Sequence, residues 1–260
     1  INKLNLYYKL EENKFSDSNI FSNNTFIKRQ NCYNCFEDIN EKNVIPEYID
    51  WRYHNAVTNV KNQGNCGSCW AFSTTGSVEG LHSIETGKLL NFSEQELVDC
   101  SKVNNGCQGG LMDNAFKFII NNGICTEDEY PYIGERQNCQ SCVSKNVISD
   151  YSDVRENNEL LLKRAVAKQP VSVAIQANLS SFRFYKTGIY SDNDCGDNLD
   201  HGVLIVGYGK DRFLDIDYWI VKNSWGPDWG ENGYIRILRN YKDSPSGMCG
   251  IAIQPSFPTN

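Results

Sequence analysis

The first half of the sequence carries its apolar residues in patterns typical of helices. Residues 69–84 contain no proline and follow the small turn Gly67-Ser68. Residues 111–121 place apolar side chains at helical spacing, and Gly123 is the expected stop. Both patterns predict helices. Ser93-Glu94-Gln95-Glu96 has the form of a capping box, which predicts another helix through Val98.

The second half of the sequence carries short apolar runs typical of strands around one helix. The predicted strands cover residues 171–175, 201–206, 218–221 and 234–238. We expect Gly207 to end the second of these, and Pro170 to stop the intervening helix at 159–168. Helices first and strands later indicate an α+β fold with two lobes, which leave a cleft where sites usually lie.

Residues 1–44 differ from the rest because they are polar, rich in Asn, Ser, Lys and Glu, and show little apolar periodicity. The packed region is expected from residue 45 to 260, with a mainly helical lobe to about residue 150 and a mainly β lobe after it. The opening residues do not resemble a signal peptide, so a secreted form would carry that signal upstream.

Composition excludes several functional classes. The chain has 260 residues, a net charge of −7 and 40% hydrophobic residues, so it has enough apolar material for a substantial core. A nucleic-acid partner would require a basic stripe, which is absent from the sequence. No apolar run approaches the roughly 18 to 20 residues of a membrane span.

The eleven cysteines indicate disulfides and an oxidising compartment. Because the number is odd, at least one thiol is left over. The alternative is zinc, since C-x-x-C occurs at Cys32–Cys35, Cys66–Cys69 and Cys139–Cys142. These pairs begin 34 and 73 residues apart, however, whereas ribbon-type zinc sites space them by roughly 15 to 20 residues. We therefore expect no metal and no cofactor.

Cys69 is the candidate nucleophile. A thiol attacks a carbonyl as thiolate, and a helix N-terminus or a nearby imidazolium lowers its pKa. Of the three histidines, His82 lies 13 residues along the same predicted helix, about 20 Å away. His54 lies in a polar stretch and is expected at the surface. His201 lies 132 residues after Cys69 at the start of an apolar strand, which makes it the expected proton partner.

Two amide side chains complete the expected chemistry. Asn223 can hold the imidazole in one tautomer without adding a carboxylate, and the adjacent Trp225 can shield that hydrogen bond from water. Gln63 can form an oxyanion hole together with the Cys69 backbone N–H. A thiol–disulfide oxidoreductase using Cys66 and Cys69 is the rival, but it leaves these amides and His201 without roles. A non-catalytic binding protein would be expected to have lost one of the catalytic residues.

These motifs resemble papain and, more closely, the cathepsin L-like cysteine proteases, over residues 45–260. The resemblance is carried by IPEYIDWR at 45–52, QGNCGSCWAF at 63–72, GCQGGLMD at 106–113, DHGV at 200–203 and NSWGPDWGENG at 223–233. It implies a papain-like two-lobed fold, with a helical lobe, a β-barrel-like lobe and the active-site cleft between them. It also implies a cysteine endopeptidase that works through a thioester acyl-enzyme.

The resemblance implies three disulfides, Cys66–Cys107, Cys100–Cys139 and Cys195–Cys249. Cys125 and Cys142 resemble an extra bridge of the falcipain-type enzymes of protozoan parasites. Cys32 and Cys35 lie outside the family pattern and either pair with each other or stay free. This leaves Cys69 unpaired.

The resemblance also implies the substrate-binding residues, which are Gly110, Leu111, Met112, Ala174, Leu199, Asp200, Gly202, Trp225 and Gln254. The pocket for the second residue before the cut has apolar or small walls and Gln254 as its floor. Because glutamine offers no negative charge there, we expect Leu, Val or Phe to be preferred over Arg. Gly110 would expose backbone groups that pair with the substrate main chain.

Residues 9–17 resemble the Asn-x-Phe-x-Asp stretch of the family's inhibitory prosegment. We therefore interpret residues 1–44 as a truncated prosegment tail and linker, with an N-terminal extension of the mature enzyme as the alternative. The expected partners are protein and peptide substrates, the prosegment and cystatin-like inhibitors, and a monomer is expected. The compartment is expected to be lysosome-like, a digestive vacuole or extracellular. Asn23, Asn91 and Asn178 begin glycosylation sequons.

Overall fold

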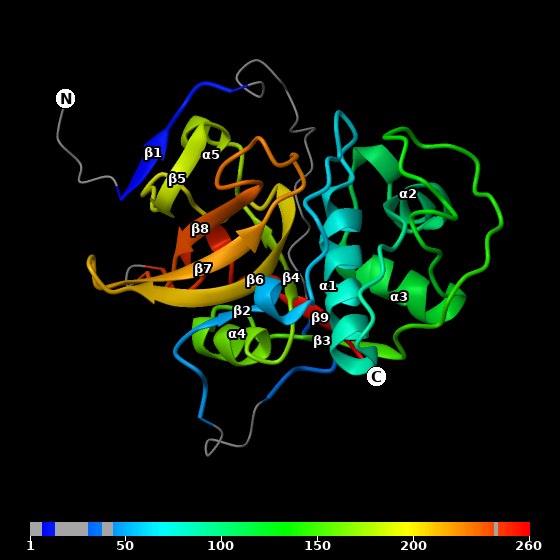
Figure 1. Ribbon diagram of the computed structural model, residues 1–260, viewed down its shortest axis with the longest axis horizontal. Helices are drawn as coiled ribbons and strands as arrows, with labels where there is room; N and C mark the ends of the chain where they lie inside the picture. Colours follow the sequence, from blue (N-terminus) through cyan, green and yellow to red (C-terminus); the bar gives the residue numbers. More distant parts are fainter. Residues whose placement is uncertain (1–6, 14–30, 38–43, 242–243) are drawn as a thin grey trace.

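The computed structural model describes residues 7–13, 31–37, 44–241 and 244–260. They form two lobes that meet along one long helix, α1 (Cys69–Thr86) (Figure 1). The helical lobe adds α2 (Glu94–Cys100), α3 (Met112–Asn122) and the short 3-10 turn Gly106–Gln108. The other lobe is built on a sheet, with α4 (Glu159–Val166) and the single turn α5 (Ser180–Arg183) beside it. The predicted α+β fold is confirmed.

Helix α1 lies between the sheet and the other helices of its lobe (Figure 1). It is buried along most of its length, and Gly87 ends it in the left-handed conformation with its N–H donated to the Ser83 carbonyl at 2.8 Å. Gly76 lets the helix approach the sheet, because a Cβ there would come within 2.7 Å of the Leu204 side chain. Close contact between helix and sheet brings the start of α1 to the strand that carries His201.

The capping box that the sequence predicts forms only in part. The Ser93 hydroxyl accepts the Glu96 N–H at 3.0 Å, as expected. The Glu96 carboxylate, however, accepts the Cys125 N–H at 2.7 Å, and the Ser93 N–H donates to the Cys125 carbonyl. The second half of the box is therefore replaced by a tertiary contact, and α2 continues two residues beyond Val98.

The sheet among the described residues has the order β1-β5-β8-β7-β6-β4-β9-β3, with β2 on β6. Its path of hydrogen-bonded neighbours does not close, so the β-barrel-like lobe is an open sheet. The strands are β1 (Tyr8–Leu10), β2 (Ile49–Asp50), β3 (Asp150–Asp153), β4 (Val171–Ile175), β5 (Tyr185–Tyr190), β6 (His201–Asp211), β7 (Ile216–Lys222), β8 (Tyr234–Leu238) and β9 (Ser256–Thr259).

The expectation that Gly207 ends a strand is wrong. Strand β6 runs on to Asp211, and its pairing with β7 shifts register between Ile205 and Gly207. A Cβ at residue 207 would lie 2.2 Å from the Ile49 carbonyl oxygen on β2. Glycine is required here by the close approach of another backbone, which is a recognised role of glycine inside strands.

Strand β4 is paired with β6 and β9 at its two edges and buried on both faces. Val171, Val173 and Ile175 pack into the core of the β lobe, whereas Ser172 and Ala174 face α1 and the core of the helical lobe. The polar residue Ser172 is buried with its hydroxyl donated to the Ser73 carbonyl on α1 at 2.8 Å. The polar side chain of this buried strand is thus satisfied by a hydrogen bond between the lobes rather than by solvent.

The described parts of the N-terminal segment lie on the sheet. Strand β1 pairs antiparallel with β5, and residues 31–37 lie against β3. Asn13 donates its side-chain amide to the Arg183 carbonyl at 2.8 Å. The rest of the prosegment-like stretch, residues 14–17, and the Asn23 sequon lie outside the described residues.

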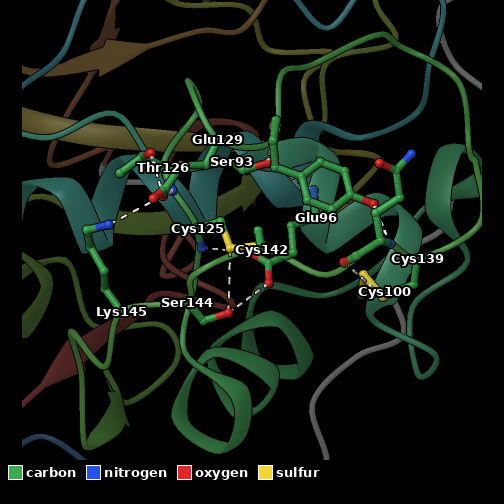
Figure 2. Close-up of a disulfide and its surroundings, with 12 residues drawn as sticks. Ser93, Glu96, Cys100, Cys125, Thr126, Glu129, Cys139, Cys142, Ser144 and Lys145 are labelled. Carbon is green, nitrogen blue, oxygen red and sulfur yellow. Dashed lines mark hydrogen bonds and ion pairs between the residues drawn. A yellow bond between two sulfur atoms is a disulfide. The ribbon is translucent and has the colours of Figure 1, made fainter.

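Five disulfides are present, and the described cysteines include one free thiol, that of Cys69. The bridges are Cys32–Cys35, Cys66–Cys107, Cys100–Cys139, Cys125–Cys142 and Cys195–Cys249. Figure 2 shows Cys100–Cys139 and Cys125–Cys142 near Glu96. Glu96, Cys125 and Cys142 have the separation of metal ligands, but the two sulfurs are bonded to each other and cannot both act as thiolates. No helix in the described ranges is long and apolar enough to cross a membrane.

Candidate active site

Cys69 is the first residue of α1 and is almost completely buried. The turn before it is fixed by the Cys66–Cys107 disulfide and by the Gly67 N–H, which donates to the Cys107 carbonyl at 2.8 Å. Ser68 occupies the N-cap position without a side-chain cap. The thiol therefore lies at a helix N-terminus, where free backbone N–H groups favour an anion.

His201 is the first residue of β6 and is also buried. Its neighbour Gly202 approaches the start of α1 so closely that a Cβ would lie 3.2 Å from both the Cys69 carbonyl oxygen and the Trp70 nitrogen. The structure thus brings the beginning of β6 onto the beginning of α1. Of the other histidines, His54 is exposed, as expected, and His82 lies near the far end of α1.

Asn223 directly follows β7 and faces the imidazole. Its Oδ1 lies 2.8 Å from His201 Nε2 and accepts the Ser224 N–H at the same distance. The Trp225 ring lies 4.9 Å from the His201 ring, centroid to centroid, and packs against Trp229. The bond between Asn223 and His201 is therefore screened from water by an indole, as the sequence suggested.

Gln63 is buried and held on several sides. Its Oε1 accepts the Ser224 hydroxyl at 2.6 Å, and its backbone N–H donates to the Ser224 carbonyl at 2.8 Å. Its Nε2 donates to the Cys66 carbonyl at 2.9 Å. Since an amide nitrogen has two hydrogens, one remains for a further acceptor. Ser224 thus links the helical lobe to the β lobe at the site.

Tyr132 contacts the segment from Gln63 to Ser68 that precedes α1. Its hydroxyl donates to the Gln63 carbonyl at 2.9 Å and lies 2.6 Å from the Ser68 hydroxyl. Its ring packs edge-on against Phe72 of α1. The sequence alone assigns no role to Tyr132 or Ser224. Ser224 lies in the stretch 223–233 that carries the family resemblance, but no local pattern indicates the hydrogen bonds of either residue.

Burial acts on both members of the thiol–imidazole pair. It raises the pKa of the Cys69 thiol to about 11, although hydrogen bonds from the backbone of Gly202 and Trp70 lower that pKa. Burial also lowers the pKa of His201 to about 4, whereas the hydrogen bond that His201 makes to the Asn223 amide oxygen raises that pKa. Burial alone favours the neutral pair, and the hydrogen bonds at both ends favour the charged pair.

A buried group of charges lies behind the site and was not expected from the sequence. Lys61 Nζ lies 2.9 Å from Glu79 Oε1 and 2.7 Å from Glu94 Oε1. Lys222 Nζ donates to the Thr58 hydroxyl at 2.9 Å, and that hydroxyl donates to Glu79. Burial raises the pKa of Glu94, whereas in Glu79 the opposing attraction of Lys61 and Lys222 prevails and the pKa is lowered. The group joins α1, α2 and β7.

The expected substrate-pocket residues come partly together. Met112, Ala174 and Leu199 belong to one buried apolar cluster, which extends to Ile253, the residue before Gln254. Leu111 is half-buried beside them, and its N–H donates to Asn104 Oδ1 at 2.9 Å. Gln254 itself is buried.

Two of the expected substrate-binding residues have clear structural constraints. A Cβ on Gly110 would lie 2.7 Å from both Asn104 Oδ1 and the Trp70 ring, so glycine is required there. Asp200 accepts the Ala177 N–H at 2.7 Å, and burial raises its pKa to about 6. The Asp200 side chain is thus tied to the loop after β4.

Comparison with known proteins identifies the family. The family model described as "Papain family cysteine protease" matches residues 45–259. The germination-specific cysteine protease 1 of Arabidopsis thaliana is 53% identical over 219 residues, covering 82% of this chain and 57% of its own length. The KDEL-tailed cysteine endopeptidase CEP2 of Arabidopsis thaliana is 49% identical over an alignment of 275 residues, covering 99% of this chain and 75% of its own length.

Solved structures give the same answer. A crystal structure of the ragweed pollen cysteine protease Amb a 11 in its proform has a TM-score of 0.89 at 44% identity, covering 99% of this chain and 83% of that one. Bromelain from Ananas comosus in complex with the E64 inhibitor has a TM-score of 0.79 at 45% identity, covering 83% and 99%. The chain spans about half to three quarters of the length of the curated relatives it matches. The chain belongs to the papain family of cysteine proteases.

Proposed function

We propose that the chain is a cysteine endopeptidase in which Cys69, His201, Asn223 and Gln63 carry the chemistry. The observation that supports this best is that the one free thiol starts α1 where β6 begins with His201, whose Nε2 lies 2.8 Å from Asn223. The rival role as a dithiol oxidoreductase loses support, because Cys66 is bonded to Cys107 and not to Cys69.

The proposed reaction starts with proton transfer from the Cys69 thiol to His201, with Asn223 fixing the imidazole through Nε2. The thiolate attacks the scissile carbonyl, and the oxyanion is stabilised by the Cys69 N–H and the remaining hydrogen of Gln63 Nε2. Collapse of this intermediate gives a thioester, and His201 donates its proton to the leaving amine. Water, deprotonated by His201, then hydrolyses the thioester and regenerates the thiol.

The reaction is tested by turnover of a fluorogenic peptide. We expect Cys69→Ser and His201→Ala to abolish turnover, whereas Cys66→Ala with Cys107→Ala keeps the catalytic residues and loses mainly stability. If the native chain accelerates the reduction of insulin disulfides over the uncatalysed rate and hydrolyses no peptide, the oxidoreductase is favoured instead.

The proposed specificity rests on the buried apolar cluster of Met112, Ala174 and Leu199 and on the uncharged Gln254. We propose a preference for Leu, Val or Phe over Arg two positions before the cut. Faster cleavage of an Arg-Arg substrate than of a Leu-Arg substrate would contradict this assignment.

The proposed subgroup is cathepsin L-like, and the resemblance of the Cys125–Cys142 bridge to falcipain-type enzymes remains a prediction.

We propose that residues 1–44 are the end of an inhibitory prosegment. The pairing of β1 with β5 and the likeness to a proform over 99% of the chain support this. N-terminal sequencing of active protein tests it, since a start well before residue 40 would favour an extension. A monomeric enzyme of the secretory pathway, open to cystatin-like inhibitors, is proposed on the same resemblance.

A further inference from the structure

Residues 31–37 form a small loop that is closed by a disulfide of its own. Cys32 and Cys35 are bonded, and between them Asn34 adopts a left-handed conformation with φ 42°. Tyr33 and Asn34 make the turn. In Figure 1 this loop is the blue stretch that runs below β3. Neither the family resemblance nor the proposed catalysis gives the bridge a role.

Asp153 on β3 docks the loop through both its backbone and its side chain. The Tyr33 N–H donates to Asp153 Oδ2 at 2.6 Å, and the Asp153 N–H donates to the Tyr33 carbonyl at 3.0 Å. The Phe36 N–H donates to the Asp153 carbonyl at 2.7 Å. Because β3 is the last strand in the sheet order, its outer edge is free to take these bonds, as in peptide binding by strand addition.

Side chains on both sides of the loop add specific contacts. The Tyr33 ring stacks on Tyr151 with centroids 4.6 Å apart, and Phe36 meets Phe257 edge-on at 5.4 Å. The Lys168 ammonium lies 4.7 Å from the centre of the Phe36 ring. Glu37 forms an ion pair with Arg155. The face therefore offers a strand edge, two aromatic contacts and two cationic side chains to one short loop.

We propose that the edge of β3, with Tyr151, Asp153 and Phe257, is a docking surface for a cystine-closed loop. Residues 31–37 occupy it in this chain, and the Cys32–Cys35 bridge keeps them there. Tyr33 and Phe36 both bond to Asp153, so docking requires a fixed distance between the backbones of these two residues. The Cys32–Cys35 bridge closes the turn and fixes that distance. Opening the bridge gives the loop conformational freedom that docking must then remove.

The bridge is the one in the chain that an external thiol reaches most easily. Cys32 is exposed and Cys35 half-buried, so neither sulfur of this bridge belongs to a buried residue. Cys139 is also exposed, but its partner Cys100 is buried, and each of the other three bridges likewise has at least one buried cysteine. The buried members of those bridges are Cys66, Cys100, Cys125, Cys195 and Cys249. A cavity of about 320 Å³ adjoins Cys32 and Cys35 and gives a reductant room to approach. Accessible bridges are the more readily exchanged ones.

A dithiol reductant opens the bridge in two exchange steps. One thiolate of the reductant attacks a sulfur of the bridge, a mixed disulfide forms, and the other cysteine leaves as a thiolate that takes up a proton. The second thiol of the reductant then attacks the mixed disulfide, so the reductant ends as a disulfide and Cys32 and Cys35 end as thiols. If residues 1–44 are a prosegment, as proposed above, a reducing compartment would loosen its attachment to the β lobe.

The test uses the whole chain with Cys69→Ser, so that no self-cleavage occurs and no readout depends on peptidase activity. Dithiothreitol is added in steps, new thiols are alkylated and mapped by mass spectrometry, and amide hydrogen exchange of Phe36 and Asp153 is followed. We expect Cys32 and Cys35 to be alkylated first and exchange at both amides to rise on the order of tenfold.

Two double variants complete the test. Cys32→Ser with Cys35→Ser should show the same faster exchange without reductant, and Cys125→Ser with Cys142→Ser should leave it unchanged. Unchanged exchange after the bridge has opened, or opening no earlier than the other bridges, would overturn the proposal. Limited reduction of the parent chain gives the same answer if the double variant does not fold. Since all readouts are independent of turnover, a negative result leaves the proposed peptidase function intact.

Discussion

Tyr132 gives the sharpest prediction about how the site is held. Its hydroxyl connects the two ends of the turn that carries the proposed oxyanion donors, since it bonds to the Gln63 carbonyl and the Ser68 hydroxyl. Tyr132→Phe removes both bonds and keeps the ring on Phe72. At about 1 kcal/mol for each neutral hydrogen bond, the loss is up to about 2 kcal/mol, or roughly 5- to 30-fold in rate.

The assay is steady-state hydrolysis of a Leu-Arg fluorogenic peptide. We expect kcat to fall and KM to change little, because a misplaced oxyanion donor is felt mainly in the transition state. Tyr130→Phe is the matched control two residues away, since its hydroxyl bonds to Asp99 Oδ2 and the Gln140 N–H instead. An unchanged kcat for Tyr132→Phe, or an equal loss for Tyr130→Phe, would refute the positioning role.

Three further predictions concern the imidazole, the pocket and a buried carboxyl. Asn223→Ala should lower kcat about 10- to 100-fold in the same assay, because the imidazolium loses a charge-assisted hydrogen bond; an unchanged kcat would contradict the role. Gln254→Glu should raise the ratio of kcat/KM for Arg-Arg over Leu-Arg peptides by about tenfold, and a constant ratio would place residue 254 outside the pocket. Burial raises the pKa of Glu127 to about 7, so the folded state holds the carboxyl proton more tightly than the unfolded state does. The stability that this protonation contributes is complete below the ordinary carboxyl pKa and is lost as the pH rises to 7. Glu127→Gln should therefore flatten the change in unfolding free energy between pH 4.5 and 7, measured by urea denaturation, and parallel curves would exclude this cause.

Long segments with a clear period could be predicted from the sequence, whereas strands defined by their partners could not. The helix at 69–84 and the strand at 234–238 correspond to α1 and β8 almost residue for residue. Strand β5 was missed because Lys186, Thr187 and Gly188 interrupt its apolar residues. It is a strand because β8 pairs on one side and β1 on the other, where a Cβ on Gly188 would meet the Tyr7 carbonyl oxygen at 2.3 Å.

The candidate site shows the same division. Local motifs indicated Cys69 and His201. The small turn at residues 67–68 predicts the start of a helix at Cys69, and the apolar run after His201 predicts the start of a strand there. The bond from Ser224 to Gln63 joins residues 161 positions apart across the two lobes. No local pattern encodes such a contact, and only the packing of α1 on the sheet creates it.

The proposed role of Cys69 as the reactive thiol is tested most directly by labelling the native chain with an epoxysuccinyl inhibitor, followed by mass mapping of the modified residue. Since the other ten cysteines are in disulfides, we predict one inhibitor molecule per chain, attached to Cys69, with complete loss of peptide hydrolysis. Modification of any other residue, or full activity after stoichiometric labelling of Cys69, would contradict the assignment of Cys69 as the nucleophile.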